Sequence, residues 1–537
     1  MLLFSKSYYF IYQTLNKIII YIYKVFFSFS EISFMDTLLR LVNDRLESSD
    51  QYSYNNNSSS SSKNSSDQNH YNFYLQNPQS QECFNNLFME DEDHFSASSS
   101  SSHHHHHQLR QLQCSTTTTS TTSTGVVAPV DQDPNFDLSE EWASTILLQT
   151  AIAIVNNNTP RIQHLMWVLN ELGSPYGDID QKLAFYFLQG MFSRVTDSGA
   201  KCYGTLAAAL EKQSCFESMR RMVLKFEEVS PWMRFGYVAS NGSLMEALQG
   251  EKKLHIIDIA GSYSSFCTQW PTFIEALATQ SDQTPHLTLT TLVAAKSEGT
   301  LRAHKKLMKE ISRRLEKFAR LMGIPFKFKP IFHYGDVSHF DFTNLPLKHD
   351  EAVAVNCSGA LRSVAPLQNR RDFLISLFRS LRPKIITVVE EEADLNAHGG
   401  ADDFVKHLQE CLRWFRLYFD SLDGSFPVVT DERLMLERAA GRAVVDLLAR
   451  GLAESVERRE TAARWVRRMH DGGFKPVSFS EDVNDDVRAL LRRYKDGWTV
   501  MDGDGAGAGM FLAWKGQPVV WAAAWVPGQV DGEKTPV

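Results

Sequence analysis

The residues with the greatest capacity for chemistry follow a short apolar run near the middle of the chain. Leu254–Asp258 (LHIID) is apolar apart from His255 and ends in a carboxylate, and a loop of small and hydroxylated residues follows it. This pattern predicts a buried strand of a parallel sheet whose carboxyl end lies at a crevice. Since an α/β enzyme binds its cofactor in such a crevice, Asp258 is the first candidate for a binding role.

A nucleotide cofactor at this position needs glycines that let backbone N–H groups approach it closely. The loop after Asp258 reads IAGSYS; it holds one glycine, Gly261, and Tyr263 places bulk where the cofactor would lie. The second predicted strand ends without the acid that would hold a ribose hydroxyl, and Glu298 lies beyond it. These departures argue against a cofactor site and predict that Asp258 caps the next helix or accepts hydrogen bonds from loop amides.

Two other groups could do acid–base chemistry. Glu390, Glu391 and Glu392 follow a predicted strand without a base or metal ligand nearby, so we interpret them as a solvated strand end or as acceptors for neighbouring arginines. His255 lies within a predicted buried strand, so we expect a hydrogen-bonded core side chain and not a general base. Neither G-x-S-x-G nor HExxH occurs. The sequence therefore predicts no catalytic residue, no cofactor and no metal site.

Composition sets wider limits on the function. The 537 residues carry a formal net charge of −8, which argues against a chain that holds nucleic acid through bulk positive charge. The seven cysteines are scattered and form no CxxC pair. We therefore expect a reducing compartment, with neither a disulfide framework nor a structural zinc site. Residues 1–34 are aromatic and apolar but broken by polar residues, so we expect an upstream extension before Met35 and not a membrane anchor.

Polar repeats dominate the next hundred residues. Serine, histidine and threonine runs between residues 55 and 124 cannot bury enough apolar surface to offset the entropy of ordering. Residues 35–137 are therefore predicted to be a disordered tail, and the histidine run is a better match to a polar expansion than to a metal site. One island, Cys83–Phe95 (CFNNLFMEDEDHF), combines aromatic residues with acids. It could dock on a partner, serve as an activation segment or be a solvated spacer.

Periodicity divides residues 138–537 into a helical part and an alternating part. Apolar residues at steps of three and four predict helices over most of residues 138–250, although none of the predicted helices covers residues 192–214. After Leu254 strands and helices alternate, and one of the predicted helices is Glu457–His470. The last two strands are expected to form a hairpin around Lys515–Gln517. The predicted fold is α/β: a doubly wound, Rossmann-like sheet of the class I methyltransferase type with an N-terminal α-helical cap.

A strongly basic helix is predicted at residues 301–322. Its apolar residues form a stripe at helical spacing, and most of its cations lie opposite that stripe: Arg302, Lys305, Lys306, Lys309, Arg313, Arg314, Lys317 and Arg320. This surface could contact phosphates, act in nuclear import or meet an acidic partner. Because no base-reading motif accompanies it, direct recognition of a DNA sequence is the weaker alternative.

Along most of residues 138–527 the chain resembles the plant GRAS family. The family's VHIID and QWP motifs are matched by Leu254, His255, Ile256, Ile257 and Asp258 and by Gln269, Trp270 and Pro271. Its C-terminal motif is matched by Trp465, Gly473, Phe474, Trp514, Trp521 and Trp525. The resemblance divides a GRAS domain at 138–537 into a first leucine-rich region and helical cap (138–250), a VHIID region (251–300), a second leucine-rich region (301–333), a PFYRE region (334–450) and a SAW region (451–527).

Four shorter segments resemble the SHORT-ROOT subfamily: MDTLLRLV from Met35, the Cys83–Phe95 island, GSPYGD from Gly173 and FCTQWP from Phe266. Two motifs depart from the family pattern. The SAW motif reads Ala523-Ala524-Trp525, and the usual Arg-Glu pair reads Arg442-Ala443. No role of that glutamate can therefore be carried over to this chain.

The resemblance implies a nuclear transcriptional regulator that acts through other proteins and is not an enzyme. It implies pairing with a SCARECROW-type GRAS protein, recruitment by BIRD-class zinc-finger transcription factors, indirect contact with DNA and no membrane partner. It also implies a role in root radial patterning and endodermis specification, presence in nucleus and cytoplasm, and movement between cells. We expect the pairing surface on the helices of residues 138–248 and a zinc-finger peptide in a groove of the α/β core. An enzyme dependent on S-adenosylmethionine and a direct DNA binder are the alternatives.

Overall fold

The computed structural model describes residues 141–528, with gaps at residues 214–215, 262–265, 281–283, 296–297, 368, 397–400, 427 and 504–507. The expected extension at residues 1–34 and the expected tail at residues 35–137, with its Cys83–Phe95 island, lie outside the described residues. Tyr263 also lies outside them. None of the helices that the structure describes is long and apolar enough to cross a membrane.

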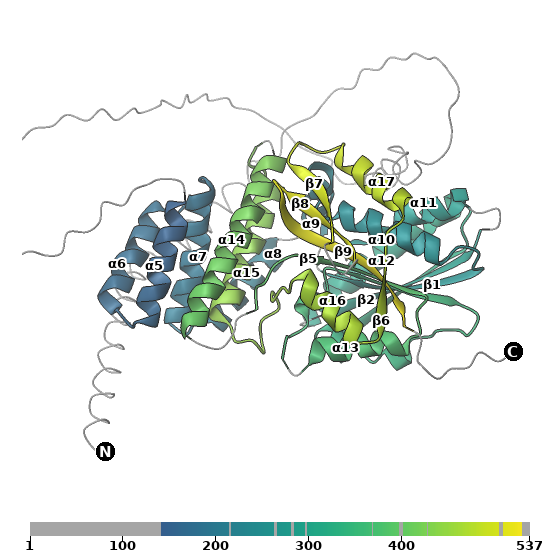
Figure 1. The fold of residues 1–537 in the computed structure, drawn as a ribbon, viewed down its shortest axis with the longest axis horizontal. Helices are drawn as coiled ribbons and strands as arrows, with labels where there is room; N and C mark the ends of the chain where they lie inside the picture. The colour runs from purple at the N-terminus through teal and green to yellow at the C-terminus, as the bar shows by residue number, and fades with distance from the viewer. Residues whose placement is uncertain are drawn as a thin grey trace, which may run out of the picture. The chain divides into compact units, whose positions relative to one another are not determined.

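Six described helices precede the first strand, where periodicity predicts a helical region (Figure 1): α5 (Trp142–Val155), α6 (Thr159–Leu172), α7 (Ile179–Val195), α8 (Gly199–Gln213), α9 (Phe216–Val229) and α10 (Arg234–Ala247). The GSPYGD segment sets the start of α7. Asp178 accepts a hydrogen bond from the Gln181 backbone N–H (2.8 Å), and the Gln181 side chain accepts one from the Asp178 N–H (3.1 Å). This reciprocal capping box satisfies two backbone donors that a helix start leaves free.

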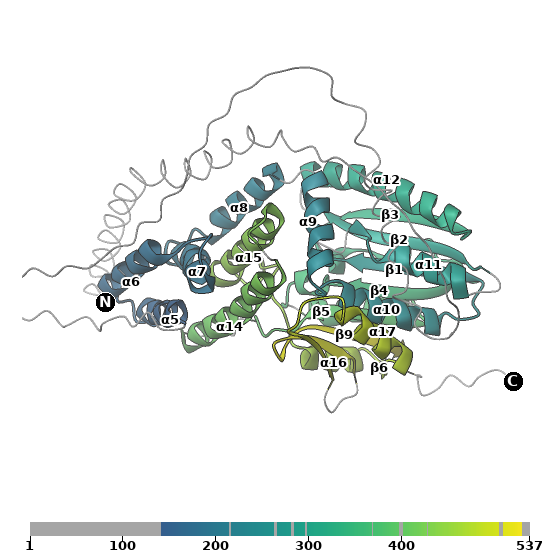
Figure 2. The same cartoon turned by 90° about the horizontal axis from the view of Figure 1, so that it is seen from above.

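Two helices from later in the chain pack with this group (Figures 1 and 2). Helix α14 (Ala401–Ser425) contacts α5 and α7, and α15 (Asp431–Ala449) contacts α7, α8 and α9. The buried Lys182 Nζ lies 2.9 Å from Glu437 Oε1, which joins α7 to α15. The Arg416 guanidinium donates to both carboxylate oxygens of Asp180 at 2.9 Å, which joins α14 to α7. The cap is thus built from helices at the start of the domain and from two helices within residues 401–449, and not from residues 138–250 alone.

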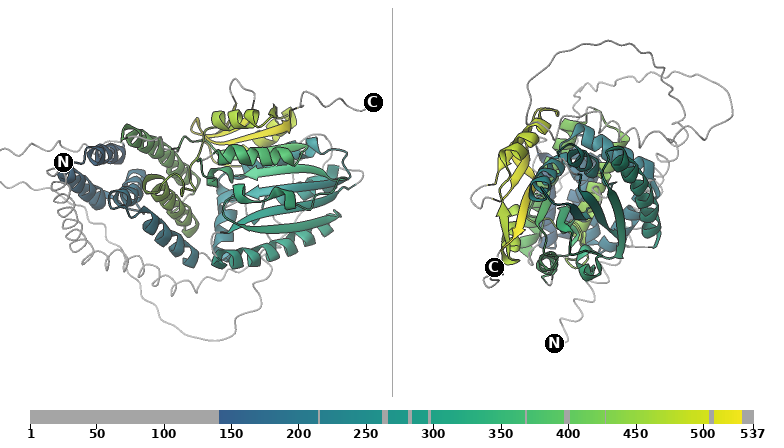
Figure 3. Two further views of the ribbon diagram at one scale, coloured as in Figure 1. Left: turned by 90° about the horizontal axis from the view of Figure 1, so that it is seen from below. Right: turned by 90° about the vertical axis from the view of Figure 1, so that its right-hand side faces the viewer.

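The described strands form one mixed sheet (Figures 2 and 3): β1 (Lys253–Ala260), β2 (His286–Ala295), β3 (Phe326–Tyr334), β4 (Ala352–Ser358), β5 (Ile385–Glu391), β6 (Phe474–Val477), β7 (Trp498–Asp502), β8 (Met510–Trp514) and β9 (Gln517–Pro527). The strand order is β3-β2-β1-β4-β5-β9-β8-β7, and β6 pairs with β9. Strands β1 to β5 are parallel, and β9 joins β5 antiparallel. This order confirms the predicted doubly wound sheet, and its direction reverses between β1 and β4.

The predicted hairpin near the C-terminus is confirmed. Strands β8 and β9 pair antiparallel, with Trp514 opposite Gln517. The two residues between them, Lys515 and Gly516, have φ of 48° and 76°. Two successive positive φ values are typical of the two-residue turns whose twist matches that of the flanking strands.

Helices cover both faces of the sheet (Figure 1). Helices α10, α11 (Trp270–Gln280) and α12 (Glu298–Leu321) pack over the face that contains Leu254 and Ile256. Helices α13 (Arg370–Ser380) and α16 (Ala462–Asp471) pack over the face that contains Ile257 and Ile259. Because side chains alternate along a strand, β1 is buried on both sides and needs its continuous apolar run. The remaining described elements are α17 (Glu481–Leu491) and the short 3-10 turns η4 (Val337–His339), η5 (Phe342–Asn344) and η6 (Leu361–Ser363).

Two helix predictions near the cap and the C-terminus need correction. Helix α10, expected within the helical cap, packs on the sheet against β5 and β9. Helix α16 begins at Ala462 and not at Glu457 as periodicity predicted. The residues just before it, 457–461, have no regular secondary structure, and one of them makes a buried ion pair, Glu460 Oε1 with Arg371 Nη1 at 2.8 Å.

Candidate functional site

All eight residues of the central motif are buried. Five come from β1, one immediately precedes α11 and two begin that helix: Leu254, His255, Ile256, Ile257, Asp258, Gln269, Trp270 and Pro271. The apolar members pack against the helices on either face of the sheet. The structure therefore brings the motif residues together, but inside the core.

The Asp258 carboxylate is the centre of a buried hydrogen-bond network. It accepts hydrogen bonds from Asn356 Nδ2 (2.9 Å), Trp270 Nε1 (3.2 Å) and Thr291 Oγ1 (3.3 Å). These donors lie on β4, α11 and β2. The prediction that Asp258 caps a helix or binds loop amides was therefore wrong, because its carboxylate oxygens accept hydrogen bonds from three side chains on other elements. The prediction of a structural role holds.

Gln269 extends this network to two more elements. Its Nε2 donates to Asn241 Oδ1 on α10 (3.0 Å), and its Oε1 accepts from Asn356 Nδ2 (3.1 Å). Thr387 on β5 donates to Asn356 Oδ1 (2.9 Å). Sequence reasoning missed Asn241, Asn356 and Thr387. Asn356 carried a signal, since it interrupts the apolar strand AVAVNCS, and a buried amide needs partners.

The two titratable residues of the motif are held away from solvent. Burial raises the pKa of Asp258 to about 6, although its three hydrogen bonds act in the opposite direction. His255 lies 2.7 Å from Glu351 Oε2 through Nδ1 and 2.8 Å from Thr290 Oγ1 through Nε2, and burial lowers its pKa. This confirms the prediction of a hydrogen-bonded core histidine. Because both ring nitrogens have partners, His255 cannot serve as a free base.

Gly261 has a packing role at the carboxyl end of β1. Its N–H donates to the Ser358 carbonyl at 2.7 Å. A Cβ at this position would lie 2.1 Å from the Gly359 carbonyl oxygen, which is too close for any side chain. The single glycine of the β1 loop therefore lets the end of β4 approach, and this contact occupies the backbone that a cofactor phosphate would need.

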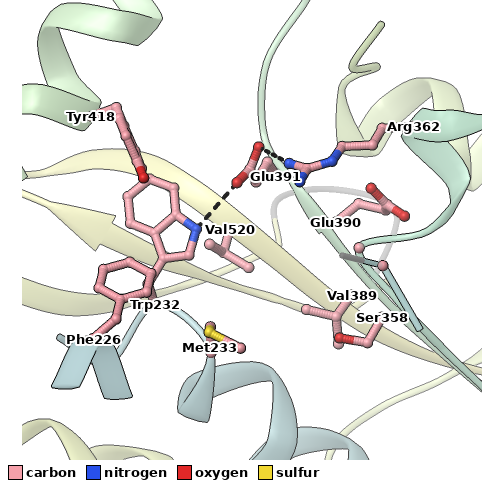
Figure 4. A pocket seen from close by; sticks show the side chains of 12 residues that line it. Phe226, Trp232, Met233, Ser358, Arg362, Val389, Glu390, Glu391, Tyr418 and Val520 are labelled. Carbon is pink, nitrogen blue, oxygen red and sulfur yellow. Dashed lines mark hydrogen bonds and ion pairs between the residues drawn. The ribbon is translucent and has the colours of Figure 1, made fainter. Parts of the chain in front are cut away.

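The three glutamates at the end of β5 lie in different environments, and Figure 4 shows two of them, Glu390 and Glu391. Glu391 accepts a hydrogen bond from Trp232 Nε1 (3.3 Å) and pairs with Arg362. It also pairs with Arg459. Burial opposes its ionisation, but the two arginines hold the pKa of Glu391 at about 2. The interpretation as an acceptor for arginines is thus confirmed for this residue.

Glu390 and Glu392 bind backbone donors. Glu390 Oε1 accepts from the Leu361 N–H (2.7 Å), and burial raises the pKa of Glu390 to about 7. Glu392 Oε2 accepts from the Ala462 N–H (2.6 Å) at the start of α16. The interpretation as a solvated strand end was wrong for Glu390, which is only 3 % exposed. Its side chain points inward because β5 is a central strand covered on both faces.

Large side chains fill the crevice at this edge of the sheet. A cavity of about 60 Å³ lies between the ends of β1, β4 and β5, and Figure 4 shows the indole of Trp232 directed at Glu391 within it. Phe226 on α9, Tyr418 on α14 and Met233 just before α10 also line it. Pockets for cofactors and drug-sized ligands are about 300–1,000 Å³, so this cavity has room for ordered water. Among the described residues, no group of three or more His, Cys, Asp or Glu is placed to hold a metal ion.

The C-terminal motif is also part of the core. Its five aromatic residues are at most 3 % exposed: Trp465, Phe474, Trp514, Trp521 and Trp525. Gly473 is the exposed member, and it adopts φ of 79° just after α16. This left-handed conformation turns the chain into β6 and favours glycine. Trp514 Nε1 donates to Asp420 Oδ2 on α14 (2.6 Å), so the motif also joins the sheet to the cap.

The predicted basic surface lies on α12, apart from both motifs. Seven of its eight residues are exposed: Arg302, Lys305, Lys306, Lys309, Arg313, Lys317 and Arg320. Arg314 is the exception, at 7 % exposed, and it pairs with Glu310. Arg314 was wrongly placed on the surface because it lies between the buried Ile311 and Leu315 at the margin of the apolar stripe.

The doubly wound sheet and its filled edge define an α/β protein with methyltransferase-like architecture. Residues 143–526 match the model of the GRAS domain family. The chain is 57 % identical over 403 residues to Protein SHORT-ROOT of Arabidopsis thaliana. That match covers 73 % of this chain and 75 % of that protein. It is 50 % identical over 415 residues to Protein SHORT-ROOT 1 of Oryza sativa subsp. japonica, and this match covers 72 % of this chain and 68 % of that protein. The chain therefore belongs to the GRAS domain family and is a plant transcriptional regulator of the SHORT-ROOT type.

A solved structure has the same fold. The crystal structure of SCL7 in Oryza sativa superposes with a TM-score of 0.60 at 23 % sequence identity. The match covers 71 % of this chain and 99 % of that chain. It confirms the predicted α/β architecture with its helical cap.

Proposed function

We propose that this chain acts as a binding scaffold in the plant nucleus and not as an enzyme. It pairs with a SCARECROW-type GRAS protein and is recruited by BIRD-class zinc-finger transcription factors, which read the DNA in its place. It acts in root radial patterning and endodermis specification, is also present in the cytoplasm, and moves between cells. The similarity to SHORT-ROOT proteins over more than two thirds of the chain supports this proposal.

The observation that carries the proposal is the filled edge of the sheet. Glu391, Arg362 and Trp232 occupy the region where an enzyme of this architecture would hold its cofactor. Asp258 on β1 accepts hydrogen bonds from three side chains of its own network. These contacts leave a cavity several times smaller than a cofactor pocket, so the edge of the sheet favours a structural role over catalysis.

The helices of the cap are the better place for a partner. Several large apolar side chains on this group are about half exposed: Ile152 on α5, Trp167 on α6, Tyr176 before α7 and Val195 at the end of α7. Exposed tryptophan and tyrosine are enriched among the residues that dominate the energy of protein interfaces. We infer that the SCARECROW-type partner contacts this group, and that a zinc-finger peptide binds the α/β core.

Calorimetric titration of the full chain with a SCARECROW-type GRAS protein tests this proposal. We expect saturable binding that Trp167→Ala weakens by at least about thirtyfold, since interface tryptophans often contribute 2 kcal/mol or more. Phe373→Ala on α13 is the matched control, because Phe373 is 55 % exposed but belongs to the core domain. Absence of binding, or equal losses for the two variants, would overturn the proposal.

A further inference from the structure

The outward face of α12 carries a continuous stripe of positive charge. Its cations recur at steps of four, three, four, four and three, so they lie on one side of the helix: Arg302, Lys306, Lys309, Arg313, Lys317 and Arg320. All six are exposed, while the apolar residues of α12 pack toward β2 and β3. The helix has 24 residues, which corresponds to a length of about 36 Å.

Most of this stripe has no anionic partner within the described part of the chain. Arg313 pairs with Glu310 (Nη2–Oε1 2.8 Å). Four other cations of the stripe make no hydrogen bond or ion pair with the described residues: Lys306, Lys309, Lys317 and Arg320. Like charges three or four residues apart destabilise a helix. An anionic ligand along this face would remove that repulsion.

Apolar groups flank the stripe at both ends of the helix. Tyr334, at the end of β3, is 57 % exposed, and its hydroxyl donates to Glu298 Oε2 (2.7 Å) in the first turn of α12. Leu321, the last residue of α12, is 66 % exposed. Lys305 Nζ lies 6.0 Å from the centre of the half-buried Phe332 ring. The surface therefore suits a ligand that combines carboxylates with apolar side chains better than it suits phosphates alone.

We propose that the chain's own acidic segment, Glu82–Phe95, docks on the α12 stripe. This segment combines five carboxylates with three phenylalanines: Glu82, Glu90, Asp91, Glu92 and Asp93, with Phe84, Phe88 and Phe95. Residues 96–140 separate it from the described domain. Those 45 residues can span up to about 150 Å, several times the length of α12, so the tether does not limit the contact.

The consequence of this contact is autoinhibition of polyanion binding. The docked carboxylates occupy the cations that would otherwise attract nucleic acid phosphates. The chain then meets DNA through its own basic face only when the acidic segment is displaced or neutralised. This accounts for a strongly basic helix in a chain whose formal net charge is −8.

Zero-length carbodiimide cross-linking of the full chain, followed by peptide mapping, tests the contact. We expect carboxylates of Glu82–Phe95 to couple to Lys306, Lys309 and Lys317 more often than to Lys384 and Lys515, which are 57 % and 61 % exposed. The yield should be independent of protein concentration and should fall in 0.5 M salt, roughly a 4 Å screening length. Even coupling to all lysines, or a yield that rises with protein concentration, would overturn the proposal.

Binding of a 20-bp duplex, followed by fluorescence anisotropy at low salt, tests the consequence. A variant with Glu90→Gln, Asp91→Asn, Glu92→Gln and Asp93→Asn should bind about fivefold to tenfold more tightly than the unaltered chain. Adding Lys309→Gln and Lys317→Gln should remove the gain. The control neutralises four exposed acids elsewhere: Glu481, Asp482, Asp485 and Asp496. An equal gain in the control would show a net-charge effect, and no gain in the test variant would show that the stripe is open to phosphates; either result would refute the docking.

Discussion

The carboxyl edge of the sheet and the outer face of α12 hold their charges in opposite ways. At the sheet edge Glu391 is buried, pairs with two arginines and accepts from Trp232. On α12, Lys309 and Lys317 are exposed and meet no carboxylate of the described chain. The molecule has the sheet of a cofactor-binding enzyme, but its own side chains occupy the crevice. The groups that are free to meet a partner lie on helices instead.

This difference predicts how each region responds to substitution. A buried polar group that loses its partner costs the full free energy of its desolvation, whereas an exposed charge is already solvated. Substitutions at the sheet should therefore change the free energy of unfolding, and substitutions of the exposed cations on α12 should change binding alone.

Removing the Asp258 carboxylate should have the largest effect. Asp258→Ala leaves the donors of Asn356, Trp270 and Thr291 buried without an acceptor, which should lower the free energy of unfolding by about 4 kcal/mol. Urea unfolding followed by circular dichroism measures this loss. Asp258→Asn is the matched control, because its amide oxygen keeps one acceptor, and it should lose about half as much. A loss below about 1 kcal/mol for Asp258→Ala would contradict a role for this network.

Glu390 should make stability depend on pH. Burial raises its pKa from 4.5 to about 7, so between these values the folded state holds a proton that the unfolded chain releases. The free energy of unfolding should therefore fall as pH rises from about 4.5 to about 7, by about 3 kcal/mol from this group.

Unfolding of the Glu390→Gln variant at pH 5 and pH 8 measures that contribution. The variant should lose less stability than the unaltered chain over this interval, although Asp258, with a pKa of about 6, contributes to the same fall. Glu316→Gln on α12 is the exposed control and should retain the full fall. The same pH dependence in the Glu390 variant and the unaltered chain would count against a buried, protonated Glu390.

Gly261 should tolerate no side chain. Gly261→Ala places a Cβ 2.1 Å from the Gly359 carbonyl oxygen, and the backbone shift needed to relieve this contact should cost about 2 kcal/mol. Gly204→Ala on α8 is the matched control, since its Cβ would meet nothing within 4 Å and alanine favours a helix. The midpoint temperature of thermal unfolding should therefore fall for Gly261→Ala and rise for Gly204→Ala. A neutral Gly261→Ala would imply that this loop is free to move.

The smallest effect is expected on the exposed stripe. Lys309→Ala with Lys317→Ala should change the free energy of unfolding by no more than about 0.5 kcal/mol, because both side chains are exposed. Arg314→Ala on the same helix is the sharper comparison. Arg314 is buried beside Glu310, so its removal should cost about 1–2 kcal/mol. Urea unfolding measures both losses. Equal losses of free energy for the lysine double variant and for Arg314→Ala would mean that the two faces of α12 contribute equally to stability.

The sequence predicted what depends on local pattern. The apolar run at Leu254–Asp258, the hairpin around Lys515–Gln517 and the apolar stripe of α12 all follow from a period of two or 3.6 residues. The burial of His255 could be predicted because it lies within the apolar run at Leu254–Asp258. Helix α8 (Gly199–Gln213) was missed, since its small residues and two glycines weaken both the propensity and the periodicity that indicate a helix.

The candidate site was harder to predict because its partners are distant in sequence. Asp258 and Asn356 are 98 residues apart, and Asp180 and Arg416 are 236 residues apart. No local pattern predicts which strand ends lie side by side or which helix from later in the chain packs against the cap. Arg314 shows a different limit, since it lies one position from the apolar stripe and its burial depends on how α12 packs on the domain.

A calorimetric titration of the full chain with S-adenosylmethionine tests the filled crevice most directly. With Trp232, Arg362 and Glu391 in the crevice, the chain should show no saturable heat at ligand concentrations up to about 1 mM. Saturable heat with a micromolar dissociation constant, lost in a folded Asp258→Asn variant, would contradict the scaffold and restore the enzyme alternative.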